Sequence, residues 1–192
     1  MNVIDTLITD RTAADVSRWK ALRAKGWEAM TEEERAEWQA GMRGGYNATD
    51  FNRVESAVLY LAEMLQTLPA ELLQYAQDNG VAWDELFGFP FDPLDYTNIE
   101  TKTTWQLGEF PSLPDRERYI ANVRLLREAV EYATSDIPET MAKFTHEDAN
   151  ALEQALSGLH DALVALDADR RTLVENTAAA WYYSGDIYLG EV

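Results

Sequence analysis

The polar residues of this chain that could act together occur twice in the sequence, 98 positions apart. Each copy contains an aspartate, an asparagine two residues later and a glutamate three residues after the asparagine. Such groups can complete hydrogen bonds at a helix start or to the other copy, which is the usual role of asparagine near a helix end. They can also line a polar pocket, shared by the two copies, that holds a small ligand. The equivalent positions are Asp50 and Asp148, Asn52 and Asn150, and Glu55 and Glu153.

The other candidates for catalysis or metal binding form no specific pattern. The two histidines, His146 and His160, do not have the His-x-x-x-His spacing of a helical zinc site. Asp167 and Asp169 lack the glycine and the closing glutamate of a calcium loop. The absence of cysteine excludes disulfide bonds, thiolate metal sites and a cysteine nucleophile. We therefore expect no catalytic residue, no metal ligand and no cofactor.

Four carboxylates between residues 81 and 112 could supply the acid and the base of a glycosidase, which needs two carboxyl groups. Acidic stretches of this kind more often form a solvated loop, and the sequence does not fix the distance between the groups. They are Asp92, Asp95, Glu100 and Glu109.

The glycine-rich stretch 41–45 could bind an anion with the help of Arg43. It matches neither the Walker nor the dinucleotide pattern, and glycines are common where helices end. The interpretation we favour is a connection between two helices.

Apolar residues around the repeated polar positions repeat as well, and their spacing predicts helices. Each copy also follows an earlier helix with a basic face. These patterns predict two helical pairs stacked about a pseudo-twofold axis. The matched apolar positions are Val54 and Leu152, Val58 and Leu156, Leu61 and Leu159, Leu65 and Leu163, and Tyr46 and Phe144.

Capping residues indicate where the helices begin and end. A capping box at residues 31–34 opens a short helix, and Ser112 opens the helix that precedes the second copy. Pro69 is expected to break or kink the helix of the first copy. The last helix is expected to begin at Thr145 or His146 and to reach as far as Ala180.

Two segments read as strands. Residues 99–105 alternate in polarity, and residues 181–189 are aromatic and β-branched around Ser184 and Gly185, which predicts a hairpin. Because a lone hairpin is marginal in water, the segment 99–105 is its expected third strand. The predicted fold is mainly α: a helical bundle with an internal two-fold repeat and a small antiparallel β-sheet. Residues 1–80 form an N-terminal helical unit, 81–112 a connector, and 113–192 a C-terminal unit; all three can belong to one compact domain.

Composition limits the function classes. The chain has 192 residues, of which 46% are hydrophobic, so it can bury a core. Its formal net charge of −18 makes nonspecific binding to nucleic acid or to anionic lipid unfavourable. No window has the apolar run of a membrane helix, and the first residues lack the pattern of a signal peptide. We expect a bacterial cytoplasmic location unless the protein leaves in a larger particle.

Three segments together carry a family resemblance: residues 45–55, 118–127 and 179–188. With Thr103-Thr104-Trp105 ahead of Phe110-Pro111, the chain resembles a domain of prophage-encoded proteins from Gram-positive gut bacteria. That domain recurs among virion and tail-associated proteins. The resemblance implies a phage structural or tail-associated role and implies no catalytic site.

The resulting hypothesis is a non-enzymatic virion component whose partners are other virion proteins or copies of itself, with no nucleic acid and no membrane. One alternative is an acidic cytoplasmic adaptor or assembly factor that binds a basic partner. A further alternative is a glycan or cell-wall hydrolase. The residues expected in interactions or at the interface between the repeats are Asn52, Glu55, Asn150, Glu153, Trp105, Trp181, Tyr182, Tyr183 and Tyr188.

Overall fold

A computed structural model describes residues 2–82, 88–130 and 136–187, with the backbone alone for residues 181–187. These residues form five α-helices and three short 3₁₀ helices, and no strand is present among them. The α-helices are α1 (Ala13–Lys25), α2 (Glu32–Gln39), α3 (Ala48–Asp78), α4 (Leu113–Arg127) and α5 (His146–Ile187), and the 3₁₀ helices are η1 (Val3–Thr6), η2 (Trp27–Ala29) and η4 (Pro93–Tyr96).

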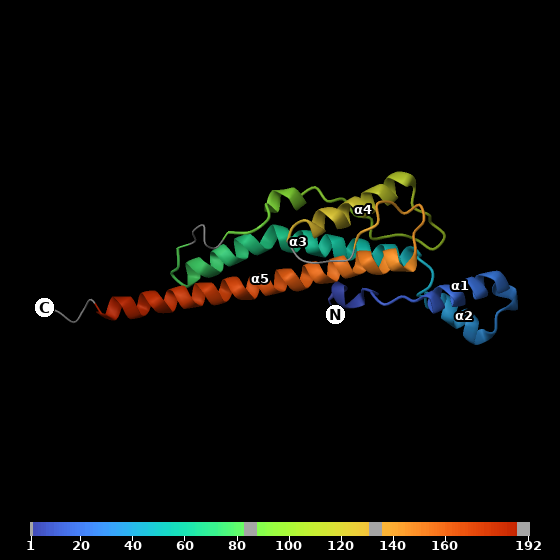
Figure 1. Cartoon of the computed structure of the whole chain (residues 1–192), viewed down its shortest axis with the longest axis horizontal. Helices are drawn as coiled ribbons and strands as arrows, with labels where there is room; N and C mark the ends of the chain where they lie inside the picture. Colours follow the sequence, from blue (N-terminus) through green and yellow to red (C-terminus); the bar gives the residue numbers. More distant parts are fainter. Residues whose placement is uncertain (1, 83–87, 131–135, 188–192) are drawn as a thin grey trace.

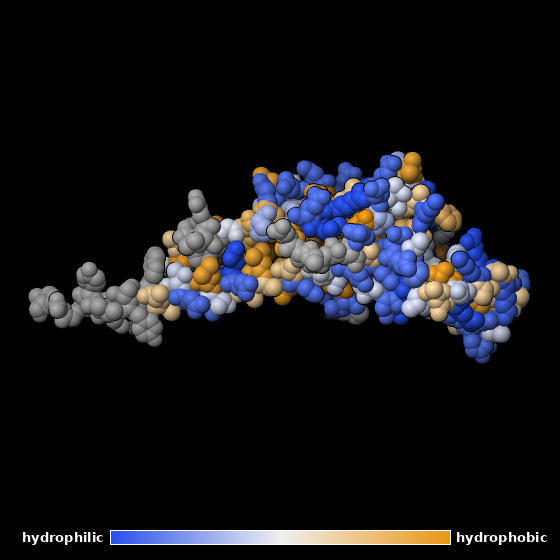
Figure 2. All heavy atoms as spheres, in the orientation of Figure 1, coloured by the Kyte–Doolittle hydropathy of each residue, from blue (hydrophilic) through white to orange (hydrophobic). Residues whose placement is uncertain are grey.

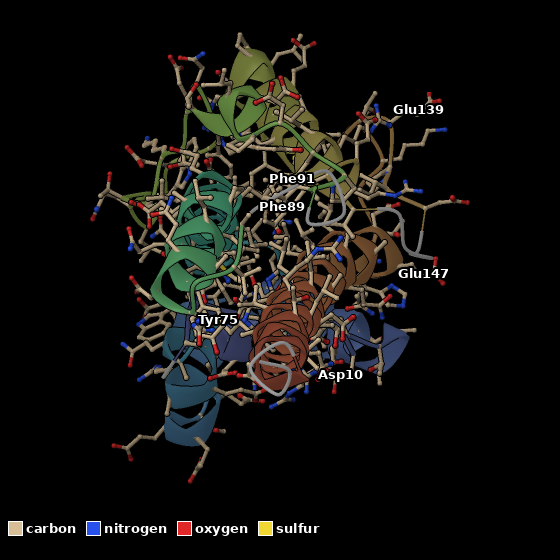
Figure 3. All side chains as sticks on the ribbon, turned by 90° about the vertical axis from the view of Figure 1, so that its left-hand side faces the viewer. Asp10, Tyr75, Phe89, Phe91, Glu139 and Glu147 are labelled. Atoms are coloured by element: carbon tan, nitrogen blue, oxygen red, sulfur yellow. The ribbon has the colours of Figure 1, made fainter. Side chains whose placement is uncertain are left out.

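The two long helices, α3 and α5, run parallel along the length of the molecule (Figure 1). Contacts between them join residues that are 100 positions apart, from Arg53 and Glu153 near one end to Tyr75 and Glu175 near the other. The repeated helices predicted from the sequence therefore lie side by side in the same direction. Figure 3 shows Tyr75 beside α5 in a view along the helices.

Matching caps begin the two long helices. The Asn47 side chain accepts from the backbone of the first turn of α3, and Asp50 accepts from the backbone N–H of Asn47. In the second copy, Thr145 and Asp148 make the equivalent pair of bonds at the start of α5. These reciprocal bonds satisfy N–H groups that a helix start leaves without partners. The aspartate of each repeat is therefore a capping residue.

The main hydrophobic core forms where α3, α5 and α4 meet, and it contains residues from both the N-terminal and the C-terminal units. The apolar stripes predicted from the sequence are buried there. From α3 and α5 come Phe51, Val54, Val58, Leu61, Leu65, Leu152, Leu156, Leu159 and Leu163, and from α4 come Tyr119, Ile120, Val123 and Leu126.

Helices α1 and α2 form a separate unit at one end of the molecule, which we call the head (residues 13–42) (Figure 1). Leu22, Met30 and Met42 form its small core. The chain re-enters the bundle through Gly44, which lies against the first turns of α1. A Cβ on Gly44 would lie 2.0 Å from the carbonyl oxygen of Asp15, so glycine is needed for this close approach.

The predicted β-sheet is wrong for the described residues. Residues 181–187 continue α5, whereas Tyr188 and the rest of the predicted second strand lie outside the described residues. An existing helix adds one hydrogen bond for each further residue, and the alanines at 178–180 are strong helix formers. The helix therefore continues through Ser184 and Gly185. Residues 99–105 form no strand. The backbone N–H and carbonyl oxygen of Trp105 bind the side chain of Asn52 in α3 instead.

The break expected at Pro69 does not occur. Helix α3 is continuous from Ala48 to Asp78, with Pro69 inside it. A proline inside a helix removes one N–H donor and usually destabilises the helix. Here Leu65, Leu68 and Leu72 on both sides of Pro69 are buried in the core. Tertiary packing therefore offsets the local cost of the proline.

The surface is largely polar on the face shown in Figure 2, where hydrophobic residues occur as separate patches. Within the ranges that the structure describes, none of the helices is both long and apolar enough to cross a membrane.

Candidate functional site

The first copy of the repeat binds the connector through its backbone. The side-chain oxygen of Asn52 accepts the N–H of Trp105 at 2.6 Å, and its nitrogen donates to the carbonyl oxygen of Trp105 at 2.9 Å. Three residues along α3, Glu55 accepts the backbone N–H of Lys102 at 2.9 Å. Residues 102–105 are therefore held by an asparagine and a glutamate one helical turn apart, an arrangement that we call a segment clamp.

The second copy makes the same clamp on a different segment. Asn150 accepts the N–H of Arg11 and donates to the carbonyl oxygen of Arg11, both at 2.9 Å. Three residues further on, Glu153 accepts the N–H of Ile8 at 2.6 Å. The clamped segments, 8–11 and 102–105, both lie ahead of a helix, α1 or α4. The repeat therefore includes the long helices and also the contact that each one makes with an extended segment of the same chain.

The charged groups around the two glutamates differ. Glu55 forms two hydrogen bonds with Arg118 of α4, both at 2.8 Å, and the Arg118 side chain is 22% exposed. Interaction with Glu55 raises the pKa of Arg118.

Glu153 is fully buried and is bound by two arginines, Arg11 at 2.6 Å and Arg53 at 2.9 Å. Asp50 also accepts from both arginines. Two carboxylates and two guanidinium groups therefore balance one another in the interior. Because buried charges are stable only when paired, this network fixes the position of segment 8–11 against α3 and α5.

Aromatic residues close the junction between the copies. The equivalent rings of Tyr46 and Phe144 meet edge to face, with centroids 5.0 Å apart. The hydroxyl of Tyr46 is hydrogen-bonded to the hydroxyl of Tyr119 from α4. Burial raises the pKa of both tyrosines above its ordinary value of 10.0, so both hydroxyls are neutral at physiological pH.

A groove of about 540 Å³ lies between the head and the beginning of α5, and we call it the head groove. Its lining contains Arg11, Lys20, Arg43 and His146 but neither aspartate nor glutamate. Three aromatic residues, Trp19, Tyr46 and Phe144, also line the groove.

Four of the interaction residues predicted from the sequence come together in pairs. Asn52 with Glu55, and Asn150 with Glu153, form the two segment clamps. Their side chains bind the backbone of the extended segments 102–105 and 8–11 of this same chain.

Trp105 is held at the first clamp with its ring buried. The ring lies 5.5 Å from that of Phe51, and the Lys102 ammonium group lies 3.8 Å from its centre. Trp181, Tyr182 and Tyr183 belong to α5, which establishes their backbone conformation only, and Tyr188 lies outside the described residues.

The other candidates have separate partners. His146 lines the head groove, while His160 contacts Asn2 and Asp161. In the connector, Asp92 caps η4, and Glu109 accepts from Gln106 and Lys102. Interactions with Gln106 and Lys102 lower the pKa of Glu109.

Sequence reasoning did not identify Arg11, Arg53 or Lys20 as site residues. Arg11 and Arg53 are ordinary basic residues in the sequence, and only the fold brings them to the same glutamate. The sequence indicates that α1 has a basic face, which includes Lys20. It does not indicate that this face lies at a groove. Arg43 was noted for its glycine-rich surroundings, and it does line the groove.

Comparison with known proteins gives no relative: no family model, no curated protein and no solved structure matches the chain.

Proposed function

We propose that this protein is a non-enzymatic structural component of a bacteriophage particle, associated with the tail, and that it acts through protein–protein contacts. The observation that carries this proposal is the extension of α5 past the end of its partner helix. By the 100-residue separation of their contacts, Asp78 at the end of α3 pairs with position 178, yet α5 continues to Ile187. The molecule thus presents a projecting helix at the end opposite the head (Figure 1).

The sequence of this projection supports a role in binding proteins. It contains Trp181, Tyr182 and Tyr183 within three positions, and tyrosine and tryptophan are enriched among the residues that carry interface energy. The resemblance to tail-associated proteins of prophages supports the particle as the place of that contact.

The segment clamps support a structural role as well. The repeated asparagines and glutamates, which are the most distinctive polar pattern in the sequence, hold two extended segments of the chain itself. An elongated framework with a projecting end suits assembly by surface complementarity.

Mass spectrometry of purified particles, collected after induction of the prophages in the source strain, tests the proposal. The chain is expected at a fixed ratio to the known tail proteins after gradient purification. Expression in the lysate with absence from the particles would contradict the proposal and favour the acidic adaptor or assembly factor. The matched control is an uninduced culture, in which neither the particles nor this chain should be recovered.

A further inference from the structure

The head groove is a local exception to the charge of the protein. The chain has 34 acidic and 16 basic residues, yet the groove lining contains Arg11, Lys20, Arg43 and His146 without a carboxylate. Arg11 is already paired with Asp50 and Glu153, and Arg43 has Asp10 as an exposed partner. Lys20 is exposed and has no ion pair among the described residues, so it is the main free positive charge of the lining. An opening of this size, with cationic and aromatic walls, suits an acidic segment that carries large aromatic side chains.

The Arg11 side chain keeps one donor without a partner beside the groove. The Arg11 side chain forms part of the groove and is only 2% exposed, but its Nε has no hydrogen-bond partner among the described residues. A buried N–H without an acceptor is costly, and buried donors are usually satisfied. Because this Nε is itself shielded from solvent, a ligand in the groove would meet the exposed Lys20 and Arg43 instead.

The other end of the molecule has the complementary composition. After Arg171 the sequence contains no lysine or arginine, whereas Asp186 lies within the aromatic stretch 181–188 and Glu191 lies just after it. This tail segment (residues 181–191) therefore has the acidic groups that the lining of the head groove lacks, together with aromatic residues that suit its aromatic walls.

The two complementary surfaces lie at opposite ends of one long helix. The groove contains the first residue of α5, His146, and the tail segment begins near its far end. At about 1.5 Å for each residue, the 42 residues of α5 separate these ends by about 60 Å. A copy cannot reach its own groove over that distance, so the segment in the groove must come from another copy.

We infer that the head groove binds the tail segment of a second copy of this chain, which gives a head-to-tail assembly. This inference rests on the proposed function, because it names a partner for the projecting end of α5. A heterologous contact of this kind extends into a ring or a filament, since every copy keeps one free groove and one free tail. Such a repeating contact is suited to the tubular or annular parts of a phage tail.

Two variants separate the two halves of the contact. The groove variant, Lys20→Glu with Arg43→Glu, reverses the charge of the groove and keeps the tail segment. The tail variant ends at Ala180 and keeps the groove. Lys20 and Arg43 are exposed, and the tail variant keeps all the residues of the described core, so circular dichroism should give folded, helical proteins in each case. Arg116→Glu with Arg127→Glu is the matched control, since it makes the same change in net charge on α4, whose residues do not line the head groove.

Sedimentation velocity across a concentration series measures the association. The wild type and the control are expected to sediment faster as concentration rises, and each of the two variants alone should remain monomeric. A mixture of the two variants should form a 1:1 dimer and stop there, because one intact groove meets one intact tail. A wild type that stays monomeric at every concentration, or a mixture that forms no dimer, would overturn the inference. Either result would leave the proposed function standing if the chain is still recovered in purified particles.

Discussion

Asn52 and Asn150 bind the chain in the same way, each accepting the N–H and donating to the carbonyl oxygen of a single residue. The bound residues are Trp105 and Arg11, and each clamped segment is followed along the chain by a helix. The internal repeat is therefore a repeat of contacts as well as of residues. Two extended segments that pair with no strand therefore still have hydrogen-bond partners for the N–H and the carbonyl oxygen of Trp105 and Arg11.

Removal of either clamp asparagine should destabilise the protein to a similar extent. In Asn52→Ala or Asn150→Ala, both backbone groups of the clamped residue lose their partner, which costs about 1–3 kcal/mol of the free energy of unfolding. Urea denaturation measures the loss. Asn98→Ala is the matched control, since Asn98 is exposed and its loss should cost less. A loss within error of zero at either position would show that the clamp does not contribute to stability.

The two clamp glutamates should respond unequally to the loss of their charge. Glu153→Gln leaves Arg11 and Arg53 with only Asp50 as a charged partner in a buried site, so we expect a loss of about 3–5 kcal/mol in unfolding free energy. Glu55→Gln should cost less, because the Arg118 side chain is 22% exposed and can be hydrated. Equal losses in the two variants, measured under the same denaturant conditions, would contradict the difference in burial described above.

Substitution of Gly44 should disturb the position of the head. The added Cβ of Gly44→Ala would overlap the carbonyl oxygen of Asp15, so α1 must shift, at a cost of about 1–3 kcal/mol. The shift should also weaken head-to-tail association, because α1 forms one wall of the groove.

Gly41→Ala provides the comparison for Gly44→Ala. Gly41 has a φ of 88° but has no atom within 4 Å of the added Cβ, so the change strains the local backbone without moving α1. Sedimentation velocity of both variants checks the difference. If Gly44→Ala associates like the wild type, the wall formed by α1 is not needed for the contact.

Acid should weaken the cap of α4. Hydrogen bonds from the Ser112 side chain and backbone lower the pKa of Asp115 below its ordinary value of 3.8. A lowered pKa in the folded state stabilises the protein at pH values above the unfolded pKa, and this contribution is lost as the pH falls through the folded value. Unfolding free energy measured below about pH 5 should therefore fall less steeply in Asp115→Asn than in the wild type. Parallel slopes for the two proteins would exclude a contribution from this cap.

The long helices could be predicted from the sequence because their information is local. The apolar stripes through Leu61 and Leu159, and the caps at Ser112 and Thr145, depend on spacing within a few turns, and all of them occur in the structure. The repeat also indicated that Asn52 and Asn150 are equivalent, which the hydrogen bonds confirm.

The predictions were wrong where contacts between residues far apart in the sequence determine the structure. The alternation in residues 99–105 predicted a strand, but its backbone groups bind Asn52 and Glu55, which lie about fifty residues away in the chain. The turn residues Ser184 and Gly185 predicted a hairpin, whereas the helix formed by the preceding residues continues through them. The ion pairs of Arg11 and Arg53 with Glu153 could not be predicted for the same reason, since no local pattern connects residues 100 or more positions apart.

Zero-length carbodiimide cross-linking of purified particles tests the central claim most directly, because it joins lysine amines to carboxylates that are in contact. If this chain is a particle component assembled head to tail, digestion should yield Lys20 joined to Asp186 or Glu191. This link can form only between copies, given the length of α5. Recovery of the chain without that link would contradict the head-to-tail contact, and failure to recover the chain from the particles would contradict the proposed function itself.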